Sequence, residues 1–442
     1  MGNLERVVGD YGIEQGFPLS KTESGTQPDR IAVIGAGPAG LTCAYQLARL
    51  GYTVRVFEAS PKPGGLLRYG IPRFRLPEHV LDAEIARIEA LGVSIECNTT
   101  VEAGIAWDEW TRDYDAVFVA IGAGKSKLLG IPGEEYENVW AATEFLHAMT
   151  DRSRVDIGQN AVVIGGGNAA MDAARVCRRA GAEATLVYHR TAREMPAMEA
   201  EVQRAREEGV QFQYLMKPVG IAREEGQTVV KCQQTRVGEL DASGRGSPVP
   251  VDGEVLLLDA SIVVLAVGQK PDTAGLCRCL WTDERSANDA QGRTSVAGVY
   301  AGGDVLGAAS VANAIAQGNR GARAIHRDLR GISEPVGETG SRGAQRVSKE
   351  RMNRGWFPWK SRKADALLMD VGGSGWDGVQ GEAQRCMSCG VCFDCGHCWS
   401  LCGEGAIVRS LIQGQPCTFK AAVCQGCGKC SEQCPCGGIE ME

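Results

Sequence analysis

The sequence predicts an α/β fold: two domains that are each built on a parallel sheet, followed by a small α+β domain at the carboxy terminus. Two observations predict the large domains, since a short apolar run twice leads into a glycine-rich turn and then into a stretch of helical periodicity. A third observation predicts the small domain. Of the 18 cysteines, 12 lie after residue 385, in two runs of similar spacing.

Composition limits the possible functions. A chain of 442 residues is long enough for two or three domains that each bury a core. The net charge of -7 argues against nucleic acid or an anionic membrane surface as partner. The most apolar run, residues 255–267, is interrupted by Asp259 and is too short to span a bilayer, and no leader peptide is recognisable. Because the chain is rich in thiols, we expect a soluble protein of the cytoplasm.

The first glycine-rich turn follows a predicted buried strand at residues 31–34 and precedes a predicted helix at residues 41–50. The strand after this helix, residues 53–57, ends in Glu58, where a carboxylate can bind a ribose. The glycines let the backbone approach a pyrophosphate at the helix amino terminus. This pattern predicts a Rossmann-like dinucleotide-binding domain, with a turn formed by Gly35, Gly37, Ala39 and Gly40.

The pattern recurs after a second predicted strand, residues 161–164. Its turn contains Gly165, Gly167 and Asn168, and Ala170 at the third glycine position still permits close helix packing. The next strand, residues 184–188, ends without a carboxylate and is followed by basic side chains: His189, Arg190 and Arg193. Basic residues there favour a 2'-phosphate, so we expect a nicotinamide site that prefers NADPH. A solvated basic loop beside an NADH site is the alternative.

A third signal lies at residues 299–304, where a strand ends in two glycines and Asp304. A predicted helix at residues 310–325 directs its amino terminus towards the ligand of Asp304. Residues 31–133 and 296–329 are therefore expected to form one domain around an inserted second domain. The turn-rich segments 131–133 and 268–271 mark the two crossings.

The carboxy-terminal cysteines have the spacing that binds cubane iron-sulfur clusters, C-x2-C-x2-C-x3-C. In two-cluster modules the fourth cysteine of each run ligates the other cluster. One [4Fe-4S] cluster is assigned to Cys392, Cys395, Cys398 and Cys434, and the other to Cys424, Cys427, Cys430 and Cys402. Zinc knuckles or disulfides do not need eight thiols in two copies of one register. A quartet is left over that could bind a third cluster or have no such role: Cys386, Cys389, Cys417 and Cys436.

Taken together, these motifs resemble the flavoprotein family of the glutamate synthase small subunit, within the glutathione-reductase-like superfamily. Further segments carry the resemblance over residues 2 to about 329: Gly2 to Arg6, Pro63 to Leu67, Tyr69 to Pro72, Ala120 to Gly124 and Met195-Pro196. The tail from Arg385 resembles the ferredoxin modules of 2-oxoacid (phenylglyoxylate-type) and sulfur-oxidation complexes.

The resemblance implies FAD at the first site and NAD(P)H at the second. It implies FAD contacts that include Gly65, Leu66 and Asp304. The implied domain division is an amino-terminal segment 1–28, an FAD-binding domain 29–150 and 270–330, an NAD(P)-binding domain 151–269, a linker 331–384 and a ferredoxin domain 385–442.

The predicted function is an NAD(P)H:acceptor oxidoreductase subunit that passes electrons between NAD(P)H, FAD and two [4Fe-4S] clusters, to or from a partner subunit. No side-chain acid or base is expected to be catalytic, because the flavin carries the chemistry. Reduction of disulfides needs paired cysteines, whereas Cys43, Cys97, Cys177 and Cys232 are solitary. Two alternatives are a true glutamate synthase small subunit and an electron-transfer scaffold with an idle nicotinamide site.

Overall fold

The structure is a computed structural model, and every structural statement below refers to the residues that it describes. These are residues 2–21, 25–101, 110, 112–150, 155–240, 246–271, 281–282, 285–286, 289, 291–307, 310–332, 397–408, 418–425, 427 and 429–432. The chain divides into two compact units, which are described separately. Gly16–Ile332 forms the larger unit, and the ends of the chain form the smaller one.

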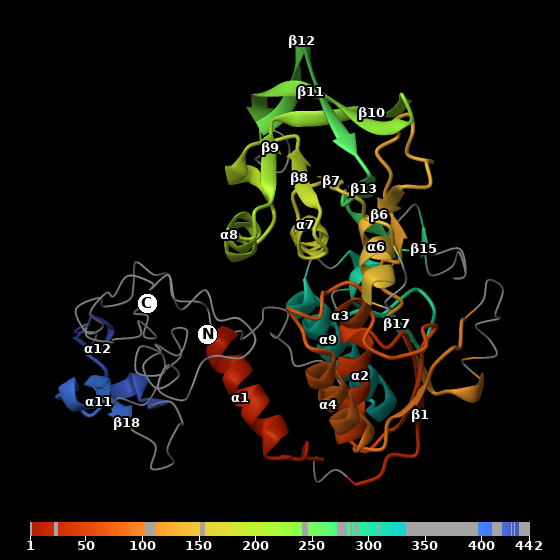
Figure 1. Ribbon diagram of the computed structural model, residues 1–442. Helices are drawn as coiled ribbons and strands as arrows, with labels where there is room; N and C mark the ends of the chain where they lie inside the picture. Colours follow the sequence, from red (N-terminus) through yellow and green to blue (C-terminus); the bar gives the residue numbers. More distant parts are fainter. Residues whose placement is uncertain are drawn as a thin grey trace. The chain divides into compact units, whose positions relative to one another are not determined.

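The first sheet of the larger unit has five parallel strands in the order β17-β4-β1-β2-β3 (Figure 1). The strands are β1 (Arg30–Ile34), β2 (Thr53–Phe57), β3 (Ser94–Glu96), β4 (Ala116–Val119) and β17 (Val299–Ala301). β1 and β4 are apolar and buried on both faces, as expected for the centre of a parallel sheet. β17 comes from the distant end of the unit, so two separate stretches of chain contribute strands to this sheet.

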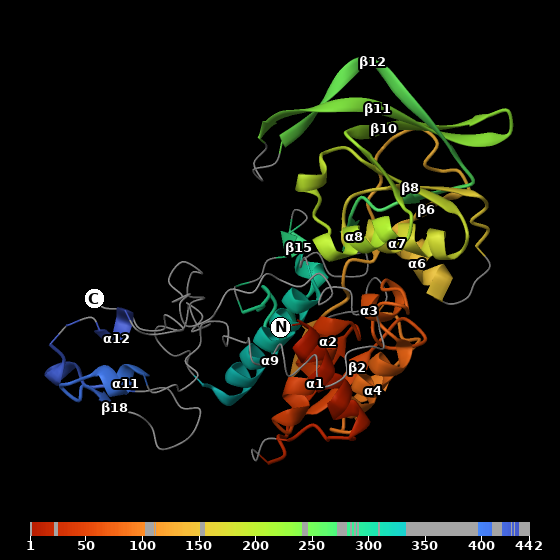
Figure 2. The same cartoon turned by 60° about the vertical axis from the view of Figure 1, so that its left-hand side comes forward.

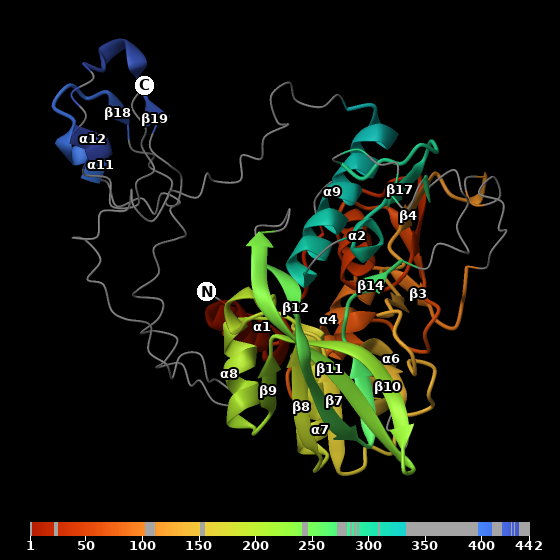
Figure 3. The same cartoon turned by 90° about the horizontal axis from the view of Figure 1, so that it is seen from above.

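Three helices cover one face of this sheet: α2 (Pro38–Arg49), α4 (Glu78–Glu89) and α9 (Val311–Arg330). Figure 3 shows α9 lying along α2. The two helices approach closely at Gly318, where a Cβ would come within 2.3 Å of the carbonyl oxygen of Ala39. On the other face, Phe57 packs edge-on against Trp110, with ring centroids 4.9 Å apart.

The second sheet also has five parallel strands, in the order β6-β13-β7-β8-β9. They are β6 (Val139–Ala141), β7 (Asn160–Ile164), β8 (Glu183–Tyr188), β9 (Gln211–Tyr214) and β13 (Ile262–Leu265). One face is covered by α6 (Ala142–Thr150), α7 (Asn168–Arg179) and α8 (Glu199–Glu207). Residues 139–150, which the sequence analysis placed with the first domain, therefore pack with the second sheet.

An antiparallel three-stranded sheet covers the opposite face of the second sheet (Figure 2). It consists of β10 (Met216–Glu224), β11 (Gln227–Leu240) and β12 (Gly246–Ala260). Its apolar side chains Ile221, Val230 and Cys232 share one core with β7, β8 and β13. The predicted apolar run at residues 255–267 is thus the end of β12 followed by β13, and it supplies a core. In the described parts of the chain, no helix is long and apolar enough to cross a membrane.

The two crossings between the large domains run side by side. β5 (Lys125–Ser126) pairs antiparallel with β14 (Gln269–Lys270). The backbone N–H of Lys127 also donates to the carbonyl of Gly268, at 2.9 Å. The predicted crossing at residues 268–271 therefore contains β14, whereas its partner strand β5 lies before the other predicted crossing, residues 131–133.

The smaller unit contains the amino-terminal helix α1 (Gly2–Glu14) and parts of the cysteine-rich tail. In the tail, α11 (His397–Leu401), β18 (Ile407–Val408), β19 (Thr418–Phe419) and α12 (Lys429–Glu432) are described. β18 and β19 pair antiparallel, and α11 packs against α12. Much of the tail lies outside the described residues, so the predicted α+β module stays a prediction.

Candidate functional site

The first glycine-rich turn connects β1 to α2, as predicted. Gly35 has a φ of 102°, and a Cβ there would come within 2.4 Å of the carbonyl oxygen of Ala120. Only glycine therefore fits that position. Gly37 differs, because it has an ordinary φ of -77° and a Cβ would meet no protein atom within 4 Å. The turn thus leaves open space at the amino terminus of α2, where backbone N–H groups can bind a pyrophosphate.

Glu58 lies at the end of β2 and is buried, with 7% of its surface exposed. Its Oε2 accepts a hydrogen bond from the backbone N–H of Ala36 at 2.7 Å, and its Oε1 accepts one from the N–H of Ser60 at 2.8 Å. The carboxylate is therefore held against the glycine-rich turn. Because a carboxylate has more acceptor positions than these two bonds use, it can also bind ribose hydroxyls.

The second turn repeats this geometry between β7 and α7. Gly165 has a φ of 147°, and a Cβ there would lie 2.4 Å from the carbonyl oxygen of Ala266. Gly167 has a φ of -91° and opens onto space free of protein atoms within 4 Å. Asn168 begins α7, and its Oδ1 accepts a hydrogen bond from the N–H of Met198 at 2.9 Å. Each turn therefore has one glycine required by the backbone and one that keeps room for a ligand.

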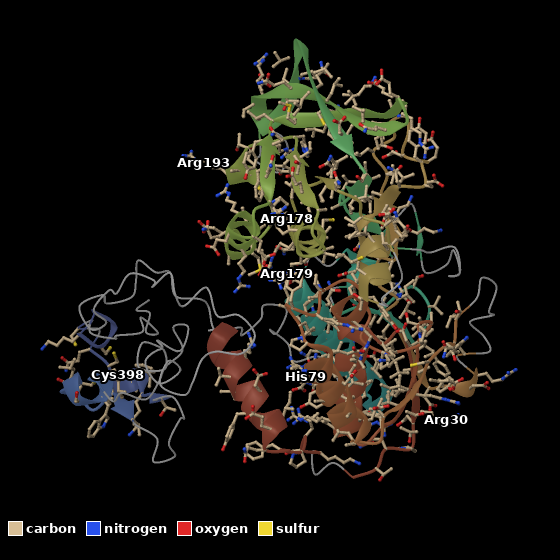
Figure 4. All side chains as sticks on the ribbon, in the orientation of Figure 1. Arg30, His79, Arg178, Arg179, Arg193 and Cys398 are labelled. Atoms are coloured by element: carbon tan, nitrogen blue, oxygen red, sulfur yellow. The ribbon has the colours of Figure 1, made fainter. Side chains whose placement is uncertain are left out.

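One cavity of about 2000 Å³ joins the two turns. Most of the predicted contact residues line it: Gly35, Gly37, Ala39, Glu58, Gly65, Leu66, Asp304, Gly165, Gly167, Asn168 and Arg190. Gly40 lies beneath the turn, where a Cβ would clash with the carbonyl of Gly35 at 1.9 Å, so its role is close packing. Arg193 is exposed and is not among the described residues that line the cavity (Figure 4).

The loop that carries Asp304 lies at the end of β17, beside the first turn of α9. The N–H of Gly303 donates to Oε1 of Gln317 at 2.6 Å, and Ser310 caps α9 by accepting from the N–H of Asn313. Burial raises the pKa of Asp304. Asp304, Ser310 and Val311 all line the cavity, so Asp304 and the amino terminus of α9 face the same space.

Three basic side chains gather at the end of the cavity near β8: His189, Arg190 and Lys217. Burial lowers the pKa of His189, and the neighbouring charges of Arg190 and Lys217 lower it further. Lys217 was missed by the sequence analysis. It belongs to β10, 27 residues beyond Arg190, and no motif marks it.

Two further lining residues were missed as well. Tyr69 of α3 (Leu66–Tyr69) and His147 of α6 face each other with ring centroids 4.3 Å apart. Tyr69 is part of a segment that carried the family resemblance, which was the available signal. His147 belongs to no motif in the sequence, so no signal pointed to it.

The described cysteines of the larger unit do not provide a redox pair at this cavity. Cys43, Cys177 and Cys232 are buried in the cores, and burial raises the pKa of each thiol, to about 12 for both Cys177 and Cys232. A thiolate, the reactive form, is therefore disfavoured at all three. Among the described residues that line the cavity there is no cysteine.

The predicted cluster ligands are only partly described. Cys398 lies on α11 and Cys402 directly follows that helix, while Cys424 and Cys427 precede α12 and Cys430 lies on it. Cys392, Cys395 and Cys434 lie outside the described residues, as do Cys386, Cys389, Cys417 and Cys436. Within the described part of the tail, no three candidate ligands come together as a metal site. Ligation by these cysteines stays a prediction.

Comparison with known proteins identifies the larger unit. The model of the family described as "Pyridine nucleotide-disulphide oxidoreductase" matches residues 29–318. The chain belongs to this family. It is therefore an oxidoreductase that uses FAD and a pyridine nucleotide, and the predicted class of enzyme and the two nucleotide cofactors are confirmed. The open space at Gly37 and Gly167 and the position of Glu58 fit these cofactors.

Relatives confirm the resemblance to the glutamate synthase small subunit. The Escherichia coli glutamate synthase [NADPH] small chain is 35% identical in an alignment of 353 positions, and the match covers 74% of each chain. The NADP(+)-dependent formate dehydrogenase subunit beta of Moorella thermoacetica is 40% identical over 435 residues, 87% of this chain and 61% of that protein. The NADPH-Fe(3+) oxidoreductase subunit beta of Geobacter sulfurreducens is 36% identical, and the match covers 54% of it. The chain thus spans little more than half of two of these relatives.

Solved structures confirm the fold. Mycobacterium tuberculosis FprA in complex with NADPH superimposes with a TM-score of 0.59 at 20% identity, covering 70% of this chain and 88% of that one. Thioredoxin reductase of Lactococcus lactis gives a TM-score of 0.54 at 24% identity, with 69% and 99% covered. At these identities the likeness concerns the two-domain α/β architecture.

Proposed function

We propose that the chain is an NADPH-linked electron-transfer subunit that exchanges electrons between NADPH, FAD and two [4Fe-4S] clusters, and through them a partner subunit. One observation carries the proposal. A single cavity joins a glycine-rich turn with a ribose-binding carboxylate, Glu58, to a second such turn with basic side chains at its end. This is the arrangement that brings two dinucleotides together in one enzyme.

The residues of the chain bind and orient the nucleotides. At the first turn, the backbone around Gly37 and the amino terminus of α2 bind a pyrophosphate, while Glu58 binds a ribose. At the second turn, α7 binds the other pyrophosphate, and Arg190 with Lys217 binds a 2'-phosphate. FAD, when bound, accepts a hydride and can release electrons singly.

The cysteine-rich tail supplies the route for single electrons. The eight thiols of the two C-x2-C-x2-C-x3-C runs support two clusters in residues 385–442.

The packing of β6 and α6 with the second sheet supports a domain boundary near residues 130–132 in place of 150. We accordingly propose an FAD-binding domain at residues 29–130 and 270–330, with residues 331–384 as a linker. The thiol content further supports a reducing compartment, which we take to be the cytoplasm.

The partner is proposed to be a catalytic subunit of a larger complex. Two of the relatives named above are beta subunits and one is a small chain. A 2-oxoacid:acceptor oxidoreductase remains a candidate assembly, and the Moorella thermoacetica relative adds a formate dehydrogenase. If the chain is instead a glutamate synthase small subunit, it must form a stable complex with a large amidotransferase subunit.

Anaerobic titration with NADPH or NADH tests the proposal directly. We expect NADPH to bleach the visible absorbance of the bound flavin, and the reduced protein to pass electrons to a one-electron acceptor. Bleaching by neither nucleotide would support the scaffold with an idle nicotinamide site. Bleaching by NADH alone would show that the basic residues near Arg190 are a solvated loop.

A further inference from the structure

A short turn of the first domain carries two side chains onto the second domain. It connects α3 to α4 through residues 70–77, and it is closed by hydrogen bonds from the N–H groups of Arg75 and Leu76 to the carbonyl of Pro72, at 2.8 and 3.1 Å. Phe74 and Arg75 both contact α7 of the second domain from this turn. The turn is therefore a direct connection between the two nucleotide-binding domains.

Arg75 makes a forked ion pair across the domain boundary. Its Nη1 donates to both carboxylate oxygens of Asp172 on α7, at 2.8 and 2.6 Å. Its Nε lies 3.3 Å from Oε2 of Glu201 on α8. Asp172 is 3% exposed and Glu201 5%, so both acids are almost fully removed from water. Burial raises the pKa of Asp172, and the charge of Arg75 opposes that shift.

Phe74 continues the contact along α7. The guanidinium carbons of Arg175 and Arg179 lie 4.7 and 3.9 Å from the centre of its ring, and Figure 4 labels Arg179 at the end of α7. Arg175 is buried and donates to Glu201 at 2.7 Å and to Glu208 at 2.8 Å. Arg75 therefore joins a charge network that α7 and α8 have already formed.

Within this network Arg75 is the ion-pair partner of Asp172. The other two acids are also paired within the second domain, Glu201 with Arg175 and Arg204, and Glu208 with Arg175 and Arg179. A buried ion pair adds little net stability, but it is satisfied in one geometry alone, and breaking it leaves an uncompensated buried charge. Such a pair between two domains penalises every other relative orientation of those domains.

The ion pair lies next to the second glycine-rich turn. Asp172 lies one helical turn beyond Asn168, so Arg75 holds the same turn of α7 that faces the cavity. On the other side, Leu66 lines the cavity at the beginning of α3, only nine residues before Arg75. Arg75 and Asp172 themselves line the cavity between the two turns.

We propose that Arg75 is a positioning residue: through Asp172 and Glu201 it fixes α7 relative to the first domain, in the orientation that places the nicotinamide for hydride transfer. Phe74 supports this orientation by covering Arg175 and Arg179. The proposal rests on the proposed function, because it assumes that a hydride passes between the two sites.

Rapid kinetics on the complete chain test the role of Arg75. In Arg75→Ala we expect flavin reduction at saturating NADPH to slow by about tenfold or more, while the NADPH concentration for half-maximal rate changes by less than about threefold. Arg55→Ala, which breaks an exposed pair with Glu96 in the first domain, is the matched control and should change neither. Equal rates in Arg75→Ala and the parent would overturn the proposal.

A double-mutant cycle separates this role from a general loss of stability. Arg75→Gln with Asp172→Asn replaces the ion pair by a neutral hydrogen-bonded pair, so the double variant should be faster than Arg75→Gln alone. Losses that simply add would show that the two side chains are not coupled, and would overturn the proposal. Arg75→Lys, which keeps one charge but not the fork, is the milder variant if Arg75→Ala does not fold.

Hydrogen exchange gives a readout that does not depend on catalysis. In Arg75→Ala, protection should fall at residues 70–77 and along α7, and it should stay unchanged in Arg55→Ala. Unchanged protection in Arg75→Ala would overturn the proposal, even if NADPH reduces the flavin. Conversely, if neither NADPH nor NADH reduces the flavin of the parent protein, the proposed function is refuted. The exchange data would still decide whether Arg75 fixes α7 relative to the first domain.

Discussion

At the scale of single residues, the two glycine-rich turns separate two uses of glycine. Gly35 and Gly165 have backbone conformations that other residues rarely adopt, so substituting them would strain the protein itself. Gly37 and Gly167 have ordinary backbone angles and open space beside them. A side chain at either of these positions should leave the fold intact and obstruct only the ligand.

This difference predicts a reciprocal pair of variants. Gly37→Leu should lose bound FAD, because the side chain fills the space into which the pyrophosphate must fit. Gly167→Leu should retain FAD but lose reduction by NADPH. Flavin absorbance after gel filtration and anaerobic NADPH titration measure the two effects, and each variant is the control for the other. Loss of FAD from Gly167→Leu alone would reverse the assignment of the two sites.

Arg190 and Arg193 differ in position, and this predicts different effects on nucleotide preference. Arg190 lines the cavity, whereas Arg193 is exposed. A charge-assisted hydrogen bond to a phosphate contributes roughly 1.5 to 3 kcal/mol, so Arg190→Ala should lower kcat/KM for NADPH by more than about tenfold relative to NADH. Arg193→Ala should change the ratio by less than about threefold. Steady-state kinetics with both nucleotides give the ratio of kcat/KM for NADPH to that for NADH. If Arg190→Ala lowers kcat/KM equally for both nucleotides, the 2'-phosphate contact is contradicted.

At the scale of elements, the strands and helices around the two turns could be predicted from the sequence, and the contacts between domains could not. Apolar strands, glycine spacing and helical periodicity are local signals, and β1, β2, α2, β7, β8 and α7 lie where these signals placed them. The pair Arg75–Asp172 joins residues that are far apart in the chain. Arg75 lies in a segment without periodicity, so only the folded structure reveals its partner.

α9 is held to the first sheet by a polar contact near its carboxy terminus. Asp328 accepts hydrogen bonds from Nε and Nη2 of Arg293, both at 2.8 Å, and from the hydroxyl of Tyr300 on β17, at 2.6 Å. The hydrogen bond from Arg293, together with that from Tyr300, lowers the pKa of Asp328. The amino terminus of α9 lines the cavity, so this contact fixes the far end of a helix that reaches the site.

The lowered pKa predicts how the contact depends on pH. A carboxylate whose pKa is lower in the folded than in the unfolded state stabilises the fold above its unfolded pKa of about 4, and this contribution disappears as pH falls through the folded value. Asp328→Asn should therefore lower the free energy of unfolding by about 1 kcal/mol near neutral pH and by less below about pH 3.5. Urea denaturation at both pH values measures the difference. Asp113→Asn, which breaks an exposed surface ion pair, is the control. If Asp328→Asn loses more free energy of unfolding at acid pH than at neutral pH, this account is refuted.

At the scale of the whole molecule, the division into two compact units separates nucleotide chemistry from the cysteine-rich tail. Gly16–Ile332 contains both glycine-rich turns and the whole described cavity. The eight predicted cluster ligands all follow residue 390, beyond that unit. We therefore expect hydride transfer and single-electron transfer to depend on different units of the chain.

Truncation and iron analysis test this separation. The full chain should contain about eight irons, from two four-iron cubes. A chain that ends at Gly381 should retain FAD and NADPH-driven flavin reduction, because the larger unit is intact, yet should not reduce a one-electron partner protein. The double variant Cys424→Ser with Cys427→Ser keeps the polypeptide but removes two predicted ligands of one cluster, so it should show a similar transfer defect with about half the iron. Twelve irons would indicate that Cys386, Cys389, Cys417 and Cys436 bind a third cluster. Undiminished transfer by the truncated chain would show that electrons leave directly from the flavin and that the clusters serve the structure of the tail.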